Sequence, residues 1–151
     1  MPQRSLHTPL GDLTVSQEQD AIVALDWGWG RDQADTPLLA EAVAQLQDYF
    51  DGRRTAFELP LAPLGTPYQQ GIWRALQAIA YGETVSYGAL AERLGTAARP
   101  VGTACGANPI PILIPCHRVI AKSGALVNYS GDGGIETKAA LLRLEGAMLA
   151  V

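Results

Sequence analysis

The chain has 151 residues, of which 48% are hydrophobic and 17% are charged, and this composition is typical of a folded globular protein. It excludes an intrinsically disordered chain, and the apolar runs are too short to cross a bilayer. The formal net charge of -4 and the pI near 5.0 argue against a protein that holds nucleic acid through a broad basic face. The acidic residues gather in the first third of the chain, however, and residues 93–122 contain no acidic side chain. This segment carries four basic ones, at Arg93, Arg99, Arg118 and Lys122. A local basic strip is therefore compatible with the acidic whole.

The N-terminus and the cysteines indicate the compartment. The first eleven residues lack the basic and apolar pattern of a secretory signal, so we expect a cytoplasmic protein with no membrane segment. Cys105 and Cys116 could form at most one disulfide bond, and without a secretory signal we expect free thiols. A chain of this length can form one hydrophobic core, or two small lobes that share a hydrophobic core. We expect a compact monomer.

The start of the chain predicts an antiparallel hairpin. Thr8-Pro9-Leu10-Gly11 is a turn sequence, and the two short β-prone runs that follow it cover residues 13–16 and 21–27. Residues 1–11 are mixed and turn-like, so we assign no strand there.

A helix and a linker complete the first lobe. Thr36 can cap a helix that has Pro37 at its first position, and apolar side chains recur at helical spacing until Gly52. Three prolines and a glycine then mark the only boundary that the sequence suggests. We therefore place an N-terminal lobe at residues 1–60, a linker at 61–66 and a second domain at 67–151.

Three helices are expected early in the second domain. Thr66-Pro67-Tyr68-Gln69 has the pattern of a capping box with proline in the first turn, and we expect Tyr68 and the apolar residues after it to face inward. Ser86 can cap a second helix at Tyr87–Leu94, which ends at a glycine, and a third helix of small residues covers 97–107. The last two have the length and turn of a helix-turn-helix, a weak signal alone because αα-hairpins are common packing units.

The end of the chain predicts a hairpin, a loop and a helix. The run VIAKSGALV would turn at Ser123-Gly124, a Gly-rich loop covers 129–134, and a last helix covers 135–144 with Glu145 at its end. The expected fold class is α+β: a small N-terminal α/β lobe, made of an antiparallel hairpin plus a helix, followed by a mainly helical C-terminal domain with a helix-turn-helix.

One stretch sets a cysteine beside a histidine. It is NPIPILIPCHRVI, residues 108–120, and its three prolines predict an extended, buried run that ends at Cys116. A cysteine becomes a nucleophile when a base or a cation stabilises its thiolate, and His117 and Arg118 are the local candidates. A buried structural cysteine is an equally good explanation from these residues alone, because adjacent side chains on an extended chain point to opposite faces.

A resemblance decides between these explanations. The run PCHRV, preceded by RPVGTACGANPIPILI and followed by SGALVNYSG, resembles the active-site region of the O6-alkylguanine-DNA alkyltransferases, also called methylated-DNA-protein-cysteine methyltransferases. The similarity extends from about Thr66 to Gly146, and PCHRV in this setting is highly specific. Residues 1–60 fit the variable N-terminal domain of that family only loosely.

The resemblance implies a DNA repair reaction. Proteins of this family bind duplex DNA through the helix-turn-helix, on the minor-groove side, flip O6-alkylguanine into a pocket, and take its alkyl group on a cysteine in one irreversible step. O4-alkylthymine is a second candidate lesion. The implied enzyme is a methylated-DNA-[protein]-cysteine S-methyltransferase that acts once and needs no cofactor.

The family's functional residues transfer to this chain by position. The implied catalytic residues are the acceptor Cys116, the water-linked base His117, the orienting carboxylate Glu145, the hinge Asn108 and the base-contacting Tyr87. The implied guanine-binding residues are Tyr129, Ser130, Val119 and Gly131. The implied DNA-binding residues are Tyr87, Arg99, which enters the stack in place of the flipped base, Ala98, Thr103 and Ala104.

The chain departs from the family pattern in a few places. Pro100 follows Arg99 where a small residue is more usual, and the loop after Tyr129 is about two residues longer than in many members, with Asp132 placing a negative charge near the pocket. Some members hold a structural zinc, but His7 and two distant cysteines cannot make a four-ligand site, so we expect no metal.

Three other functions compete with this interpretation. One is a lesion-binding module without chemistry, which the presence of Cys116 argues against. Another is a Cys-His hydrolase or thiol-dependent transferase with true turnover, which would need an oxyanion hole. The third is a thiol-containing DNA-binding regulator, which the acidic pI disfavours.

Overall fold

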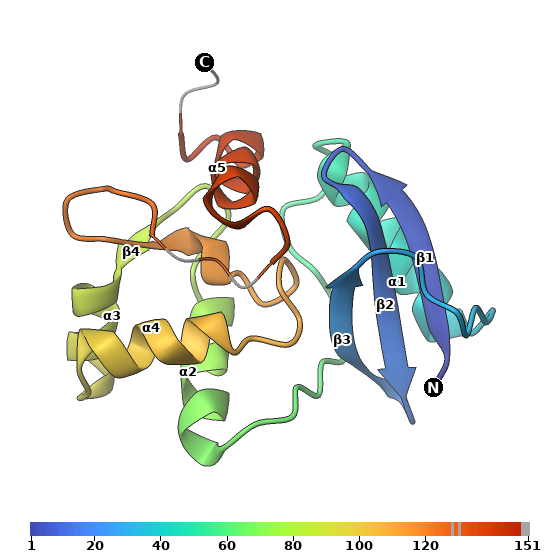
Figure 1. The fold of residues 1–151 in the computed structure, drawn as a ribbon, viewed down its shortest axis with the longest axis horizontal. Helices are drawn as coiled ribbons and strands as arrows, with labels where there is room; N and C mark the ends of the chain where they lie inside the picture. Colours follow the sequence, from blue (N-terminus) through green and yellow to red (C-terminus); the bar gives the residue numbers. More distant parts are fainter. Residues whose placement is uncertain (128, 130, 149–151) are drawn as a thin grey trace. The chain divides into compact units, whose positions relative to one another are not determined.

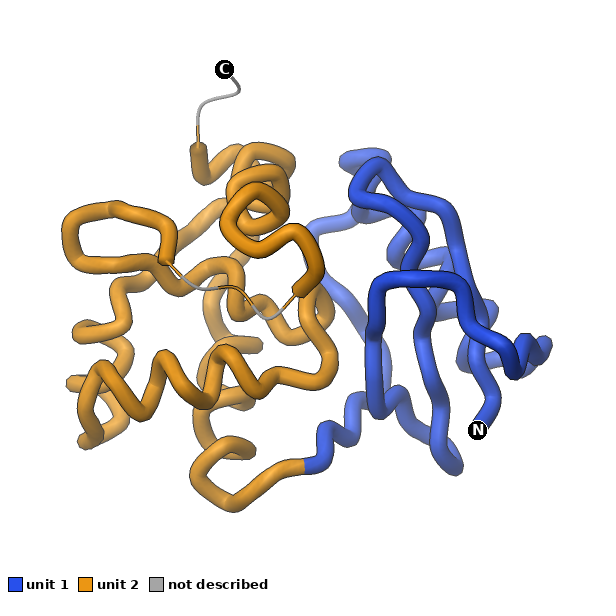
Figure 2. Tube along the Cα trace, in the orientation of Figure 1, with its two compact units in different colours: residues 1–64 blue, residues 65–151 orange. Residues whose placement is uncertain are grey.

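The computed structural model describes residues 1–127, 129 and 131–148 and divides the chain into two compact units, Met1–Leu64 and Gly65–Val151 (Figure 2). The first unit contains a three-stranded sheet and one helix, and the second is mainly helical (Figure 1). The expected α+β class is confirmed. Within the described ranges, no helix is long and apolar enough to cross a membrane.

The sheet of the first unit has three antiparallel strands in the order β1-β2-β3, one more than the predicted hairpin. They are β1 (Gln3–Thr8), β2 (Gly11–Glu18) and β3 (Ala21–Trp27). Strand β1 was not predicted because one of its two buried residues, Ser5, is polar. The Ser5 hydroxyl lies 2.7 Å from the hydroxyl of Thr14 on β2. This pairing satisfies two buried hydroxyls within the sheet, so the strand needs no apolar alternation.

Helix α1 (Pro37–Phe50) begins and ends where the sequence predicts. The Thr36 side chain accepts a hydrogen bond from the Leu39 amide at 3.0 Å, and Pro37 occupies the first turn. The helix packs against the sheet, and the core of the unit is apolar. Its fully buried residues include Leu13, Val15 and Ile22 of the sheet and Leu39, Leu46 and Tyr49 of the helix.

Helix α2 (Pro67–Gln77) opens the second unit with the predicted capping box. Thr66 accepts from the Gln69 amide at 3.1 Å, and the Gln69 side chain accepts from the Thr66 amide at 2.9 Å. The prediction that Tyr68 faces inward is wrong, because its side chain is exposed and its hydroxyl lies 3.0 Å from that of Thr96. The buried stripe of α2 starts one turn later, and Trp73 in it donates its indole N–H to the Ala104 carbonyl at 2.9 Å.

Helices α3 (Tyr87–Leu94) and α4 (Ala98–Gly106) form the predicted helix-turn-helix. Ser86 caps α3, Gly95 ends it in the left-handed conformation at φ 68°, and the two helices pack against each other. Because Trp73 ties α4 to α2 as well, the exposed side of α4 is held on a rigid base.

The predicted hairpin after residue 118 is wrong. A turn does form, with the Gly124 amide donating to the Ala121 carbonyl at 2.8 Å, but β5 (Val119–Ile120) pairs in parallel with β4 (Val85–Ser86) instead of with the chain beyond the turn. Val119 is fully buried, so its strand needs a partner in the interior, and the segment before α3 provides it. The last helix, α5 (Gly134–Leu144), packs against the turn of 3-10 helix η1 (Cys116–Arg118).

Candidate active site and DNA-facing helix

The segment before Cys116 is buried, but it is a turn and not the expected extended run. Ile112 has a φ of 74°, and the Ile114 amide donates to the Ile110 carbonyl at 2.9 Å. The Asn108 side chain closes this turn from inside. Its amide donates to the Ile114 carbonyl at 2.9 Å and its oxygen accepts from the Ile110 amide at 3.0 Å. A side chain that supplies both a donor and an acceptor to nearby backbone overrides the extended preference of the prolines.

The backbone strain in this turn lies at Ile112, four residues before Cys116. A β-branched residue in the left-handed region costs about 1–3 kcal/mol, and it persists only where its surroundings fix it. Ile112 is buried, and Asn108 holds the turn on both sides of it. The Cys116 amide then donates to the Ile114 carbonyl at 2.8 Å, which joins the strained turn to η1. Cys116 therefore stands on a fixed support.

Behind the cysteine, Glu145 makes a buried hydrogen-bonded cluster with the two residues that follow Cys116. One carboxylate oxygen, Oε2, lies 2.7 Å from Nε2 of His117 and 2.9 Å from Nη2 of Arg118, and the other, Oε1, lies 2.8 Å from Nε of Arg118. The remaining guanidinium nitrogen of Arg118, Nη1, donates to the Ile79 carbonyl at 2.7 Å. All three side chains are buried, so the ion pair of Glu145 and Arg118 is shielded from water.

This geometry fixes the form of the histidine. An ionised carboxylate can only accept hydrogen bonds, so the proton of neutral His117 is on Nε2 and the lone pair is on Nδ1. Nδ1 is buried and has no hydrogen-bond partner within the part of the chain that the structure describes. Burial lowers the pKa of His117, and the hydrogen bond and charge of Glu145 act in the opposite direction. At neutral pH the ring is a neutral base held by a carboxylate.

Around the thiol, Tyr87 and Lys138 form a second polar group. The Tyr87 hydroxyl donates to the Val127 carbonyl at 3.1 Å, and the buried Lys138 ammonium donates to the Tyr87 oxygen at 3.3 Å and to the Val127 carbonyl at 3.0 Å. Burial, followed by the charges of the two cysteines, raises the pKa of Tyr87 to about 12, so this hydroxyl remains a donor. Burial lowers the pKa of Lys138, and a thiolate at Cys116 opposes that shift.

Cys105 differs from Cys116 in its surroundings. It lies on α4, and burial, followed by the charge of Cys116, raises its pKa to about 12. It is therefore a thiol at neutral pH and a poor nucleophile. Both cysteines are free and buried.

The expected guanine-binding residues that the structure describes come from β5 and from the loop ahead of α5. Val119 is on β5 and fully buried, and Gly131 accepts a backbone hydrogen bond from Gly134 at 3.4 Å ahead of α5. Burial, followed by the charges of Cys116 and Glu145, raises the pKa of Tyr129 well above its ordinary value. Ser130 lies outside the described residues.

The expected DNA-binding residues of α4 line two hollows. Arg99 and Thr103 line both hollows and form the ridge between them. Arg99 and Thr103 are one helical turn apart, Thr103 donates its hydroxyl to the Arg99 carbonyl at 3.2 Å, and both are exposed, as is Ala98. Ala104 is buried, facing α2.

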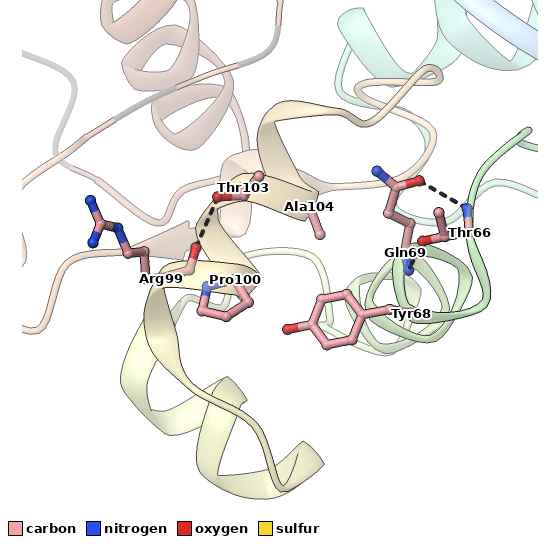
Figure 3. A pocket seen from close by; sticks show the side chains of 7 residues that line it. All are labelled: Thr66, Tyr68, Gln69, Arg99, Pro100, Thr103 and Ala104. Carbon is pink, nitrogen blue, oxygen red and sulfur yellow. Dashed lines mark hydrogen bonds between the residues drawn. The ribbon is translucent and has the colours of Figure 1, made fainter.

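The hollow on one side of the ridge, which we call the Tyr87 hollow, has a volume of about 410 Å³ and is lined by Tyr87, Ala98, Arg99, Gly102, Thr103 and Val127. The hollow on the other side, the Tyr68 hollow, has a volume of about 440 Å³ and is lined by Thr66, Tyr68, Gln69, Arg99, Pro100, Thr103 and Ala104 (Figure 3).

The sequence did not predict the roles of two residues of the site, Lys138 and Arg118. Lys138 lies three and four residues before the buried Leu141 and Leu142, so its position on the apolar stripe of α5 was a usable signal. Arg118 was considered as a partner of the thiol and as part of a local basic strip, whereas it is buried and pairs with Glu145. In the described ranges, no group of three or more His, Cys, Asp or Glu could hold a metal ion.

A strained turn that presents a cysteine, a buried His-Glu pair behind it and a helix-turn-helix beside it define a thiol-dependent protein of two units. Family models agree with this class. The model described as 6-O-methylguanine DNA methyltransferase, ribonuclease-like domain, matches residues 1–63, and the one described as 6-O-methylguanine DNA methyltransferase, DNA binding domain, matches residues 67–147. The chain belongs to the 6-O-methylguanine DNA methyltransferase family.

Individual relatives are similar over almost the whole chain. The constitutive methylated-DNA-protein-cysteine methyltransferase of Bacillus subtilis is 46% identical, over 91% of each chain. The methylated-DNA-protein-cysteine methyltransferase of Mycobacterium leprae is 42% identical, over 94% of this chain and 90% of its own. Among solved structures, Mycobacterium tuberculosis OGT in complex with DNA superimposes with a TM-score of 0.87 at 41% identity, over 97% of this chain and 94% of that one.

Proposed function

We propose that this chain is a DNA repair protein that flips O6-alkylguanine out of duplex DNA and transfers the alkyl group irreversibly to its own Cys116. The observation that carries the proposal is the buried hydrogen bond between Glu145 and His117, the residue directly after the buried Cys116, beside a helix-turn-helix in a chain of this family. DNA is its partner, as it is for the mycobacterial OGT in the complex with DNA.

The transfer is a single displacement. The Cys116 thiolate attacks the alkyl carbon, the S–C bond forms, and the C–O6 bond breaks with its electron pair moving to the guanine. The guanine leaves after taking up a proton, and the protein keeps a thioether. A thioether has no good leaving group, so the site cannot regenerate itself, and each chain acts once.

In this proposal His117 removes the thiol proton. Its free lone pair is on Nδ1, and a water between Nδ1 and the sulfur would complete the path, since adjacent residues rarely hydrogen-bond side chain to side chain. Glu145 holds the ring in this tautomer and stabilises the imidazolium that forms, as carboxylates do in hydrolase triads. Arg118 and Asn108 act by position: the first fixes Glu145 and the second fixes the turn under Cys116.

The base-binding roles fall to the residues near the thiol. Tyr87 keeps its proton at neutral pH, so it can donate to the flipped base and supply a proton as guanine leaves. Tyr129, Ser130, Val119 and Gly131 would line the guanine pocket. An alkyl carbon inside the base stack is out of reach of a buried sulfur, and this is why flipping is required.

The helix α4 would enter the minor groove as the second helix of the helix-turn-helix. Its small residues permit close approach, and Arg99 on the exposed ridge would fill the space of the flipped base. Ala98 and Thr103 would contact the backbone, and Ala104 would contribute to the wall of the Tyr68 hollow. The protein would act as a monomer, and O4-alkylthymine is a second candidate substrate.

The division of labour and the compartment are part of the proposal. Catalysis and DNA binding would belong to residues 67–151, joined by the linker 61–66 to the lobe 1–60. The two free thiols suit the reducing cytoplasm. No cofactor takes part in any step.

Titration with a duplex that contains one O6-methylguanine tests this function. Intact-mass spectrometry should show a gain of one methyl group per chain, after which added substrate remains methylated. Cys116→Ser should bind the lesion duplex and gain no mass. More than one methyl group removed per chain would show turnover and refute the proposal.

A further inference from the structure

The turn that follows α2 contacts the buried ion pair of Arg118 and Glu145. Nη1 of Arg118 donates to the Ile79 carbonyl at 2.7 Å, which holds the guanidinium against the chain just after α2. Two residues further on, the ring of Tyr81 faces the same guanidinium, with 5.9 Å between the Arg118 carbon Cζ and the ring centroid. This distance is within the range of a cation–π contact. The transfer reaction described above assigns no role to Tyr81.

The same tyrosine also holds the residue before Glu145. Its hydroxyl donates to the Leu144 carbonyl at 3.2 Å. The last carbonyls of a helix have no donor within the helix, so a side chain from another segment can bind them. Burial, followed by the charge of Glu145, raises the pKa of Tyr81, so the hydroxyl keeps its proton and remains a donor. Tyr81 therefore contacts the cation of the ion pair through its ring and the backbone beside the carboxylate through its hydroxyl.

Close packing at Gly82 keeps this turn against the end of α5. Gly82 has a φ of 84°, and a Cβ added there would lie 3.3 Å from the Glu145 carbonyl. The turn is closed by the Glu83 amide, which donates to the Ala80 carbonyl at 3.0 Å. Because Tyr81 lies inside this closed turn, its position relative to Glu145 is fixed.

We propose that Tyr81 is a positioning residue of the relay, which keeps the Glu145 carboxylate bonded to Nε2 of His117. This inference rests on the proposed function. His117 and Arg118 share one carboxylate oxygen, Oε2, at 2.7 and 2.9 Å. A small movement of the carboxylate therefore strengthens the bond to one partner and weakens the bond to the other. Tyr81 holds both the guanidinium and the end of α5, so it fixes this division, and His117 keeps the acceptor that sets its tautomer.

The charges around His117 make this positioning matter for its basicity. Burial lowers the pKa of His117, and the hydrogen bond and charge of Glu145 raise it. The other ionisable side chains that interact with His117 or with Glu145 are Arg118, Lys138, Tyr81 and Tyr129. The two cations lower the pKa of His117 further, and the two tyrosines are neutral because their own pKa values are raised. A displaced Glu145 therefore leaves His117 a weaker base for the thiol proton.

Two substitutions separate the hydroxyl of Tyr81 from its ring. Tyr81→Phe removes the hydrogen bond to Leu144 and keeps the ring beside Arg118, whereas Tyr81→Leu removes both contacts. The matched control is Tyr49→Phe, which removes a hydroxyl from the buried core of the first unit. The single-turnover rate of alkyl transfer on a lesion duplex is measured against pH for each chain. The exchange of the His117 Nε2 proton with water is measured by heteronuclear NMR without DNA.

The pH dependence of the transfer rate distinguishes positioning from support of the fold. At neutral pH we expect Tyr81→Phe to slow transfer about twofold to fivefold relative to Tyr49→Phe, as for the loss of one ordinary hydrogen bond, and Tyr81→Leu to slow it about tenfold. Both losses should disappear as the pH approaches about 8.5, where the thiol ionises without a base. Losses that are equal at every pH, or no larger than in the control, would overturn the inference.

Proton exchange tests the inference without the DNA reaction. The Nε2 proton of His117 is buried and bonded to Glu145, so it should exchange slowly in the unmodified chain and in Tyr49→Phe. We expect exchange about twofold to fivefold faster in Tyr81→Phe, and an unchanged exchange rate would overturn the inference. If the unmodified chain transfers no alkyl group, the proposed function fails, while the exchange rates still decide whether Tyr81 positions the partner of His117.

Discussion

Replacing Glu145 by glutamine perturbs the proposed relay at its buried end. The two carboxylate oxygens accept three hydrogen bonds, one from His117 and two from Arg118. A glutamine amide has one accepting oxygen and one donating NH₂ group, so in either orientation the NH₂ faces a donor of Arg118. If it also faces Nε2, His117 must move its proton to Nδ1 to accept there, and the lone pair that would take the thiol proton is lost.

The magnitude follows from the bonds and charges that are lost. A hydrogen bond to a charged group contributes about 1.5–3 kcal/mol, which corresponds to a fall of roughly one to two units in the pKa of His117. Burial already lowers that pKa, so a further fall makes the ring a weaker base. We expect the rate of alkyl transfer at neutral pH to fall about tenfold to a hundredfold. The free energy of unfolding should also fall by about 3 kcal/mol, because Arg118 is left as a buried charge without its carboxylate.

The assay is the single-turnover rate against pH for the unmodified chain, Glu145→Gln, His117→Ala and the double variant. Glu136→Gln, an exposed position on the same helix, controls for the loss of a carboxylate. Both single variants should regain rate as the pH approaches the ordinary pKa of a free thiol, about 8.5. The double variant should lose little more than either single one, since residues that act as a unit are not additive. Flat pH profiles, or losses that add fully, would show that these residues only support the fold.

Further expectations concern DNA, the leaving base and pH. Arg99→Ala should slow repair of duplex DNA by tenfold or more, on the order of the loss of one good contact, with a far smaller effect on free O6-benzylguanine; equal losses on both substrates would refute a flipping role. Tyr87→Phe removes the hydroxyl that hydrogen-bonds Val127 and Lys138. The single-turnover rate on lesion DNA should fall about tenfold, and an unchanged rate would refute a contact between this hydroxyl and the base. The pKa of His117 is lower in the folded chain than its ordinary value of 6.5. Below pH 6.5 the unfolded chain therefore binds this proton more readily than the folded chain does. The free energy of unfolding should therefore fall as the pH drops below 6.5, by up to about 1.4 kcal/mol per pH unit for this group. Denaturant titrations should show a shallower fall in His117→Ala, and parallel curves would contradict this.

The sequence predicted well the structure that depends on neighbouring residues. The caps at Thr36, Thr66 and Ser86 each bond an amide three residues on, and all three helices begin where these caps indicate. Strand β1 was missed because its buried Ser5 is satisfied by a hydroxyl on another strand, which no local pattern shows.

The site was harder to predict because its contacts are distant in sequence. The bond between His117 and Glu145 spans 28 residues, and the resemblance to a known family was the only reason to pair them. The proline-rich run was assigned as extended because the closing bonds of Asn108 depend on a side chain that folds back on its own turn. Lys138 was overlooked because a lysine on an apolar stripe is ordinarily assigned to the surface.

The identity of the alkylated cysteine tests the central claim most directly. The chain is incubated with a duplex containing O6-methylguanine, digested, and mapped by tandem mass spectrometry, with Cys105→Ser as the control that removes the other thiol. We predict one methyl group on the peptide that contains Cys116, in both proteins, and none on the peptide that contains Cys105, whose raised pKa of about 12 keeps it a thiol. Methylation of the Cys105 peptide, or an unmethylated Cys116 peptide in Cys105→Ser, would contradict the account.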